Sequence, residues 1–585
     1  MTSDIATASL EPTMPSRTGD SPRAAQPVSP LLVASVLAVV TVALALTWAV
    51  PTVAGWAHSG QLARLSLVDC VRAVADPRLL GADPASAYPP GAADLMPGPW
   101  GFWTCAGLVG LTILGAAGGA ARSAEVRMSR PSADRRWWQL RGRRPHEFGR
   151  YRTVTDLIVP GPSTDRVVVG YFGRPRSLIA ITDSVQMAVL AAPRTGKSSG
   201  LVIPAILEHE GPIVTTSVRT DIAEHTIDRR HRLGRVWVWD PFGQDSDAWD
   251  LLHGCEDWEH ALLVARWLGH ARRIGEGINQ DYFDQEAEGL VAPYLHAAAL
   301  TPDVSAAGVY RWILDRDDRT ADEILSDVGA DDARERLRAV YAYTERQRDG
   351  IIGTAAVQLK AYGHPAAART ARRAAGMTPE ALFDGPNALY IVAGREHQQL
   401  LAPLVVTMIS SMLFWLSEQE NRTGRGLRPP ALFALDETAS IAPIQDLPQI
   451  LATSLGSGVR FLTVWHSVAQ IRRHFGVDAA AEILALSQAK VFMGSITDQY
   501  TRQEIVELLG HRQRLAAPGS SGADVMSAQA LQRTSAGEGL LINGDLPPVI
   551  FRQRRHYLDS DLRRLKGTQT ATVGGLPGRA APSAP

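Results

Sequence analysis

The sequence predicts an α/β protein with a mostly parallel sheet, an all-helical insertion and two membrane-spanning helices ahead of the globular part. Short apolar runs alternate with helical patterns along the 585-residue chain from about Tyr151 onward. Such alternation is typical of a parallel sheet with helices on both faces. Two long uncharged segments near the N-terminus, and one helix-like stretch without a convincing strand, indicate the other two features.

The apolar runs have the length and the flanking residues of buried strands. They are Ala188–Ala192, Pro212–Ser217, Val236–Asp240, Ala388–Val392, Ala431–Leu435, Arg460–Val464 and Lys490–Met493. Helical patterns lie between most of them, including a long one at Gln398–Asn421. Residues 248–384 are helix-like nearly throughout, so we expect an all-α domain inserted into the α/β core.

Two N-terminal segments have the length of membrane-spanning helices. Leu31–Val50 and Trp100–Ala121 carry no charged residue. At a rise of about 1.5 Å per residue, either one crosses a hydrocarbon core of roughly 30 Å. A cleaved signal peptide fits the first segment poorly, because the apolar run is too long and the polar residues 1–30 precede it.

The distribution of arginine predicts the orientation of these spans. Arginines are few in the loop between the spans and dense in residues 122–150, directly after the second span. This bias places the N-terminus and the large C-terminal part in the cytoplasm, with the protein in the inner (cytoplasmic) membrane. The basic stretch, with Trp137 and Trp138, suits either a membrane surface or a nucleic acid.

Overall composition excludes two classes of protein. The net charge of −1 is incompatible with a globally basic nucleic-acid-binding surface, so any DNA contact must come from a local patch or a pore lining. The three cysteines are too few and too scattered for a disulfide framework or a zinc site.

These patterns divide the chain into successive parts. They are a disordered cytoplasmic leader (1–30), two transmembrane helices (31–50 and 100–121) with a short external loop (31–121 in all), a basic juxtamembrane linker (122–150), an α/β core (151–247 and 385–566), the inserted all-α domain (248–384) and a flexible tail (567–585).

The segment Met187–Ser199 has the layout of a phosphate-binding loop. An apolar strand ends in the turn Ala-Pro-Arg-Thr-Gly-Lys-Ser-Ser, which leads into an apolar helical pattern. In such a loop, backbone N–H groups hold phosphate oxygens, a lysine reaches the outer phosphates and a hydroxyl ligates Mg²⁺. Ala191 stands where the motif has its first glycine. The sequence predicts a site for ATP and Mg²⁺ formed by Pro193, Arg194, Thr195, Gly196, Lys197, Ser198 and Ser199.

A second motif supplies the acidic partners of this loop. The apolar run Ala431–Leu435 ends in two adjacent carboxylates. Asp436 is expected on the metal side, and Glu437, just beyond the strand, is expected to polarise the attacking water. His466 follows the next strand and either senses a γ-phosphate or caps the strand end. Arg460 begins that strand, and we predict for it the role of a charge-neutralising finger acting across a subunit boundary.

With these motifs in place, the chain resembles the membrane-anchored coupling proteins of type IV secretion and bacterial conjugation (the TraD/TraG type). The resemblance covers about Leu31 to Leu562. Apart from the order of these features, four stretches of sequence support the resemblance. They are Ala192–Pro204, the predicted strand followed by Asp-Pro at Val236–Gly243, Gln280–Leu290 at the start of the helical domain, and Trp465–Arg472. The last stretch is similar to the family's Q-S-x-x-Q element, with His466 in place of the first glutamine. Gln470 keeps the second glutamine, which implies that it is a nucleotide-binding residue.

The resemblance implies a RecA-like P-loop ATPase core in a homo-hexamer, with ATP hydrolysis stimulated by DNA. The implied partners are single-stranded DNA bound without sequence specificity, a relaxase or other cargo protein bound by the helical domain, and inner-membrane secretion channel proteins. Three alternatives stay open: a double-stranded-DNA translocase of the chromosome-segregation type, a non-hydrolysing cargo receptor, and a protein-export ATPase. The departures at Ala191 and His466 leave Lys197, Asp436 and Glu437 in place, so an active enzyme is expected.

Overall fold

The computed structural model describes residues 47–62, 65–112, 148–173, 177–271, 278–373, 376–509, 511–512, 523–524 and 537–567. The chain divides into two compact units, Met1–Asp134 and Arg135–Pro585. The predicted leader, residues 31–46 of the first predicted span, residues 113–121 of the second, nearly all of the basic linker and residues 568–585 lie outside the described residues.

The first unit contains short helices around a small apolar cluster. Residues 47–59 and 99–112 are helical within the described range. Between them lie α2 (Leu67–Ala75), η1 (Pro77–Leu80), η2 (Pro84–Ala87) and α3 (Pro90–Ala93). Tyr88, Met96 and Phe102 are buried in the cluster. The loop between the predicted spans therefore packs, together with the start of the second predicted span, around one apolar cluster.

One helix of the described chain is long and apolar enough to cross a membrane. This is α16 (Gln398–Thr423), and 61% of its apolar stretch is buried within the protein. It packs against α8 (Trp258–Gly269) and α17 (Thr438–Ile441). A helix that is buried in this way is a core helix of the second unit. Most of the first predicted span lies outside the described residues, so the two-span prediction stays a prediction.

The second unit is built on one mixed sheet, which has twelve strands among the described residues, in the order β1-β3-β2-β14-β13-β10-β4-β9-β8-β5-β7-β6. The strands are β1 (Ile158–Val159), β2 (Val168–Tyr171), β3 (Leu178–Ala180), β4 (Met187–Ala191), β5 (Ile213–Ser217), β6 (Val236–Trp239), β7 (Ala388–Val392), β8 (Ala431–Leu435), β9 (Val459–Trp465), β10 (Ala489–Met493), β13 (Glu538–Asn543) and β14 (Leu546–Arg552). A separate pair joins β11 (His511–Arg512) to β12 (Ala523–Asp524).

Every neighbouring pair from β10 to β6 is parallel, and every pair from β10 back to β1 is antiparallel. The strands predicted from the sequence are all present and make up the parallel part. The antiparallel part, from the C-terminal hairpin β13–β14 and the N-terminal strands β1 to β3, was not predicted. The sheet is therefore mixed.

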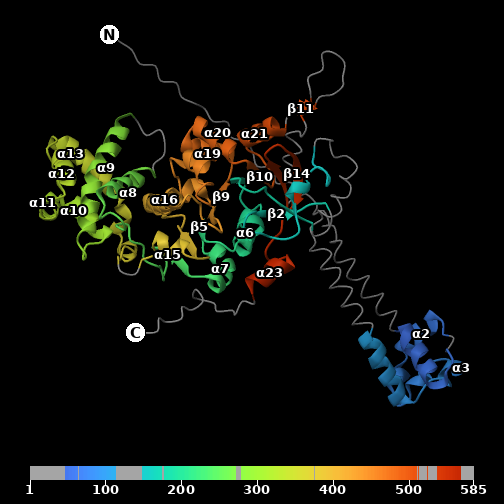
Figure 1. The fold of residues 1–585 in the computed structure, drawn as a ribbon. Helices are drawn as coiled ribbons and strands as arrows, with labels where there is room; N and C mark the ends of the chain where they lie inside the picture. Colours follow the sequence, from blue (N-terminus) through green and yellow to red (C-terminus); the bar gives the residue numbers. More distant parts are fainter. Residues whose placement is uncertain are drawn as a thin grey trace, which may run out of the picture. The chain divides into compact units, whose positions relative to one another are not determined.

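Helices cover both faces of the parallel strands (Figure 1). In β4, Ala188 and Leu190 belong to one apolar cluster, and Val189 and Ala191 belong to the other. Because alternate residues of a strand point to opposite faces, a strand covered on both sides is apolar throughout. The helices outside the insertion are η3 (Thr155–Leu157), η4 (Ser198–Val202), α6 (Ile203–Glu208), α7 (Asp221–Leu233), α16, α17, α18 (Leu447–Thr453), α19 (Val468–Phe475), α20 (Val477–Leu486), α21 (Gln499–Leu509) and α23 (Ser560–Lys566).

The chain between β6 and β7 forms helices, most of which gather around α9 in Figure 1. The long helix α9 packs against α8, α10, α11, α12 and α13. These elements are α8, α9 (Ile278–Ala299), α10 (Ala306–Asp315), α11 (Asp318–Asp327), α12 (Asp331–Tyr341), α13 (Glu345–Gln358), η5 (Lys360–Gly363), α14 (Pro365–Ala368) and α15 (Pro379–Phe383).

Candidate nucleotide-binding site

The phosphate-binding loop connects β4 to the helical turn η4. Gly196 has φ of +89° and Arg194 has φ of +64°, so the loop turns through two left-handed residues just before Lys197. Only glycine adopts this conformation without strain, which explains Gly196. Ala191 is the last residue of β4, pairs with Met493 of the parallel neighbour β10, and does not have a positive φ. Alanine is therefore compatible with the position where the motif has a glycine.

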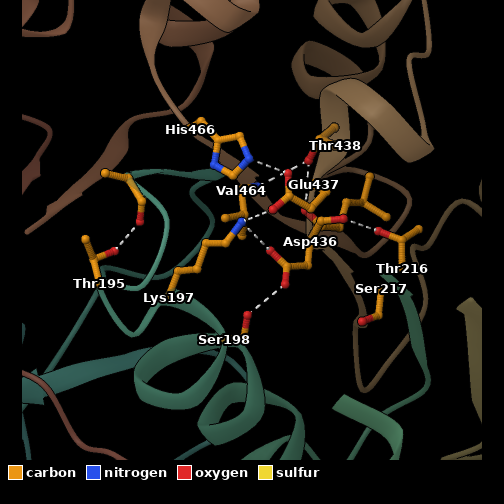
Figure 2. A network of polar contacts seen from close by, with 12 residues as sticks. Thr195, Lys197, Ser198, Thr216, Ser217, Asp436, Glu437, Thr438, Val464 and His466 are labelled. Atoms are coloured by element: carbon orange, nitrogen blue, oxygen red, sulfur yellow. Dashed lines mark hydrogen bonds and ion pairs between the residues drawn. The ribbon is translucent and has the colours of Figure 1, made fainter. Parts of the chain in front are cut away.

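The carboxylate of Asp436 lies directly beside this loop (Figure 2). It follows β8, and its Oδ2 atom accepts a hydrogen bond of 2.8 Å from the Ser198 hydroxyl. Its Oδ1 atom is 3.4 Å from Lys197 Nζ. The hydroxyl of Thr216, on the adjacent strand β5, donates to the Asp436 backbone carbonyl at 2.8 Å. Two parallel strands thus hold Asp436 against the loop.

Glu437 adopts an unusual backbone conformation that brings its side chain to the same place. Its φ of 57° is left-handed, which is rare for a residue with a side chain and is concentrated at functional sites. Lys197 Nζ donates to Glu437 Oε1, and His466 Nε2 lies 2.8 Å from Glu437 Oε2. Figure 2 shows the lysine between the two carboxylates. The sequence predicted that Asp436 lies on the metal side and that Glu437 lies beyond the strand, toward the attacking water. In the structure both carboxylates contact Lys197.

The two acids differ in electrostatics. Burial raises the pKa of Asp436, against the opposing charge of Lys197. Burial also raises the pKa of Glu437, but the hydrogen bond from His466 and the charge of Lys197 outweigh it and lower this pKa to about 2. Glu437 is therefore ionised at neutral pH and is able to accept a hydrogen bond from water.

His466 and Gln470 lie at the carboxyl end of β9, next to the acids. The backbone N–H of His466 donates to Gln470 Oε1 at 2.8 Å, and Ser467 caps α19 by accepting from the Gln470 N–H. The His466 ring reaches Glu437, and its predicted role as a γ-phosphate sensor or as a strand-end cap stays a prediction. Gln470 is connected to the acid pair through its bond to the His466 backbone.

Arg460 is the one predicted site residue that the structure places elsewhere. It lies near the amino end of β9, and so at the opposite edge of the sheet from the carboxylates. Arg460 is buried, with 7% of the residue exposed, and pairs with Asp165 at 3.6 Å. Its role as a finger acting across a subunit boundary stays a prediction.

The structure adds residues that carry no sequence motif. Gln553 follows β14, and its side-chain amide donates to the Thr195 carbonyl at 3.1 Å, inside the phosphate-binding loop. The Thr438 hydroxyl accepts from the Val464 N–H at 3.2 Å and ties β8 to β9. No local pattern could have identified either residue, because each acts through a contact between distant segments.

The donor set fits a magnesium nucleotide. A lysine, a hydroxyl and two carboxylates meet at the carboxyl ends of parallel strands, where ligands of open α/β sheets bind. Ser198 and Asp436 offer oxygen ligands 2.8 Å apart. No group of three or more His, Cys, Asp or Glu residues within the described ranges forms a metal cage. Mg²⁺ suits such a site because it takes one or two protein oxygens together with substrate phosphates and water.

Comparisons with known proteins agree with this geometry. A family model described as type IV secretory system conjugative DNA transfer matches residues 163–542. The conjugal transfer protein TraG of Escherichia coli is 22% identical in an alignment 380 residues long that covers 58% of this chain and 57% of TraG. Protein VirD4 of Rhizobium rhizogenes is 22% identical in an alignment 433 residues long that covers 66% of this chain and 60% of VirD4. The chain thus spans less than two thirds of these relatives.

Solved structures of similar fold include those of the conjugative coupling protein TrwB. The unbound form has a TM-score of 0.55 at 15% identity and covers 70% of this chain and 93% of that chain. The complex of TrwB with ADP and Mg²⁺ has a TM-score of 0.53 at 14% identity and covers 68% of this chain and 96% of that chain. At a sequence identity of 14 to 15%, these comparisons establish a similar fold and not a shared activity.

Proposed function

Because this chain belongs to the type IV secretory system conjugative DNA transfer family, we propose that it is a membrane-anchored coupling protein that hydrolyses ATP to drive DNA transfer. The observation that carries the proposal is the meeting of Lys197, Ser198, Asp436 and Glu437 in one cluster. Structures of TrwB with ADP and Mg²⁺, and with a non-hydrolysable ATP analogue, support ATP and Mg²⁺ as the ligands.

In this proposal each residue of the cluster has a role. Lys197 and the N–H groups of Pro193–Ser199 (proline excepted) bind phosphate oxygens, while Ser198 and Asp436 hold Mg²⁺, which neutralises phosphate charge when bound. Glu437 orients water and accepts its proton, as an ionised carboxylate can. His466 connects Glu437 to the start of α19, so loss of negative charge at the nucleotide is expected to reach that helix. Gln470 supports His466.

The domain organisation proposed from the sequence extends this function. The helical segment 248–384 is the proposed docking domain for a relaxase or another cargo protein. The two predicted spans anchor the chain in the cytoplasmic membrane, beside the secretion channel. A homo-hexamer would enclose single-stranded DNA through phosphate contacts, whose affinity falls as salt rises.

The test is ATP hydrolysis by the full-length protein in detergent, measured without DNA and with single-stranded or double-stranded DNA. We expect stimulation by single-stranded DNA that weakens as salt rises. Lys197→Ala should lower the rate on the order of 100-fold, because a charge that stabilises the transferring phosphoryl group is lost. Lys360→Ala is the matched control, since Lys360 is an exposed lysine in the helical segment.

Four outcomes would overturn the proposal. A wild-type protein that binds no nucleotide, or that hydrolyses ATP equally with and without DNA, is not a DNA-driven coupling ATPase. Stimulation by double-stranded DNA alone would indicate a translocase of the chromosome-segregation type. Stimulation by cargo peptide but not by DNA would indicate a protein-export ATPase.

A further inference from the structure

The segment Gln553–Tyr557, directly after β14, packs on the phosphate-binding loop. Gln553 donates to the Thr195 carbonyl at 3.1 Å, and the His556 N–H donates to the Ser199 carbonyl at 3.0 Å. A Cβ atom on Gly196 would lie 2.8 Å from Gln553 Oε1 and 3.7 Å from Arg555 Nε. Residues that are 358 positions apart in the chain are therefore in direct contact at the loop.

A buried ionic network fixes this segment in place. Arg554 Nη1 lies 2.6 Å from Glu208 Oε1, at the end of α6, and Arg554 Nε lies 3.2 Å from Asp559 Oδ2. Tyr171 donates a hydrogen bond to the same carboxylate. The side chains of Arg554, Glu208 and Asp559 are 2%, 5% and 4% exposed. Since α6 follows the phosphate-binding loop, the network fixes the segment to the loop's own helix.

Arg555 differs from its neighbour Arg554 in both exposure and partners. Its side chain is partly exposed, and its Nη1 atom donates to the Tyr557 hydroxyl at 3.2 Å. No carboxylate among the described residues forms an ion pair with it, whereas Arg554 has two such partners. A guanidinium that forms no ion pair with any described residue thus lies beside Gly196, on a segment attached to the loop by these hydrogen bonds and ion pairs.

We propose that Arg555 is a nucleotide-binding residue of this site, contributed by the C-terminal end of the core, and that it binds a phosphate oxygen of the nucleoside triphosphate. The inference rests on the proposed function, because it takes the ligand to be ATP. A guanidinium next to a phosphate loop makes charge-assisted hydrogen bonds to phosphate, and a rigid support lowers the entropic cost of ordering it. Arg555 thereby adds a second cation beside Gly196, contributed by a different segment of the chain from Lys197.

The test is the affinity of the full-length protein for a fluorescent ATP analogue and for the corresponding AMP analogue. Arg555→Ala should weaken binding of the ATP analogue about 10-fold, the effect of losing one charge-assisted hydrogen bond. Binding of AMP should change less, because fewer phosphate oxygens are present. Arg555→Lys should recover part of the loss, since it keeps the charge but not the planar fork.

Arg563→Ala is the matched control, because Arg563 is an exposed arginine of α23 in the same C-terminal segment. Its affinity for the ATP analogue should equal that of the wild type. An Arg555→Ala affinity within two-fold of the wild type, with binding abolished in Lys197→Ala, would refute the role of Arg555 and leave the proposed function standing. No binding by the wild type would overturn both.

Discussion

Lys197 is held by the carboxylates that would share the site with its phosphate ligand. Its Nζ atom donates to Glu437 and lies 3.4 Å from Asp436. To reach a nucleotide's outer phosphates, the ammonium has to give up at least part of its contact with Glu437. Nucleotide affinity and hydrolysis are therefore opposed at this residue: the acid that activates water also competes for the lysine.

This competition gives opposite signs for the two effects of Glu437→Gln. We expect ATP hydrolysis to fall on the order of 100-fold or more, because a neutral amide does not accept the proton of the attacking water. We expect ATP to bind more tightly, because Lys197 is released from an ion pair. Steady-state hydrolysis and equilibrium titration with an ATP analogue measure the two quantities. Glu482→Gln, at an exposed position of α20, is the control. Unchanged hydrolysis in Glu437→Gln would remove Glu437 from the catalytic role.

The residues of this site differ in how far the sequence predicted them. Lys197, Ser198 and the acid pair belong to short local motifs, so the types and the spacing of these residues were enough to predict them as site residues. The left-handed turn at Glu437 did not follow from the alternation of a strand, which predicts opposite faces for neighbouring residues. Gln553 and Arg555 have no local signal, because their placement depends on the pairing of β14 with β13 and β2.

At the scale of elements, burial explains part of which strands the sequence predicted. The parallel strands β4, β5, β8 and β10 are buried along their whole length and are mainly apolar. β14 contains Pro547 and Pro548 and is mostly half-buried, so its pattern resembles an irregular segment. β1 and β3 are only two and three residues long, which is too short for any periodicity to appear.

Arg230 joins three elements at the amino edge of the sheet. It lies on α7, is 0% exposed, and donates to the carbonyls of His209, Gly211, Pro386 and Asn387 at 2.6 to 3.2 Å. These carbonyls precede β5 and β7. Burial lowers the pKa of Arg230 to about 10, so it remains charged at neutral pH. A buried cation is retained here because backbone oxygens take the place of a carboxylate.

Arg230→Met should destabilise the protein by about 3 kcal/mol, because it fills the space but leaves several buried carbonyls without donors. We expect the variant to lose folding stability but to keep the ATP hydrolysis activity of its folded fraction, because the Lys197 cluster is at the other edge of the sheet. Denaturant unfolding of the variant measures this free energy. His231→Ala, at the next and exposed position of α7, should stay within about 0.5 kcal/mol. Equal stability of both variants would refute the structural role of Arg230.

At the scale of the whole molecule, the two units differ in how much of their structure the sequence predicted. Hydropathy and charge, which are local properties of the chain, predict the order of leader, spans, core and insertion. The parallel core of the second unit is also predicted from these local patterns. The N-terminal unit has its own apolar cluster around Tyr88 and Phe102, which separated hydropathy peaks do not reveal. Its folded segment lies between the two predicted spans, and so on the external side of the membrane in the proposed topology.

The last prediction tests this topology by thiol labelling. Ala82 is exposed in the N-terminal unit and Ser326 is exposed in α11, so a cysteine at either position is open to a water-borne reagent. The native Cys70 and Cys255 are buried and Cys105 is half-buried within the second predicted span, which keeps the background low. With a membrane-impermeant maleimide, Ala82→Cys should be labelled in intact cells, and Ser326→Cys only after lysis, because the arginines of residues 122–150 hold the second unit in the cytoplasm. The unsubstituted chain is the control for native thiols. Labelling of Ser326→Cys in intact cells, or of Ala82→Cys only after lysis, would show that the two-span orientation is wrong.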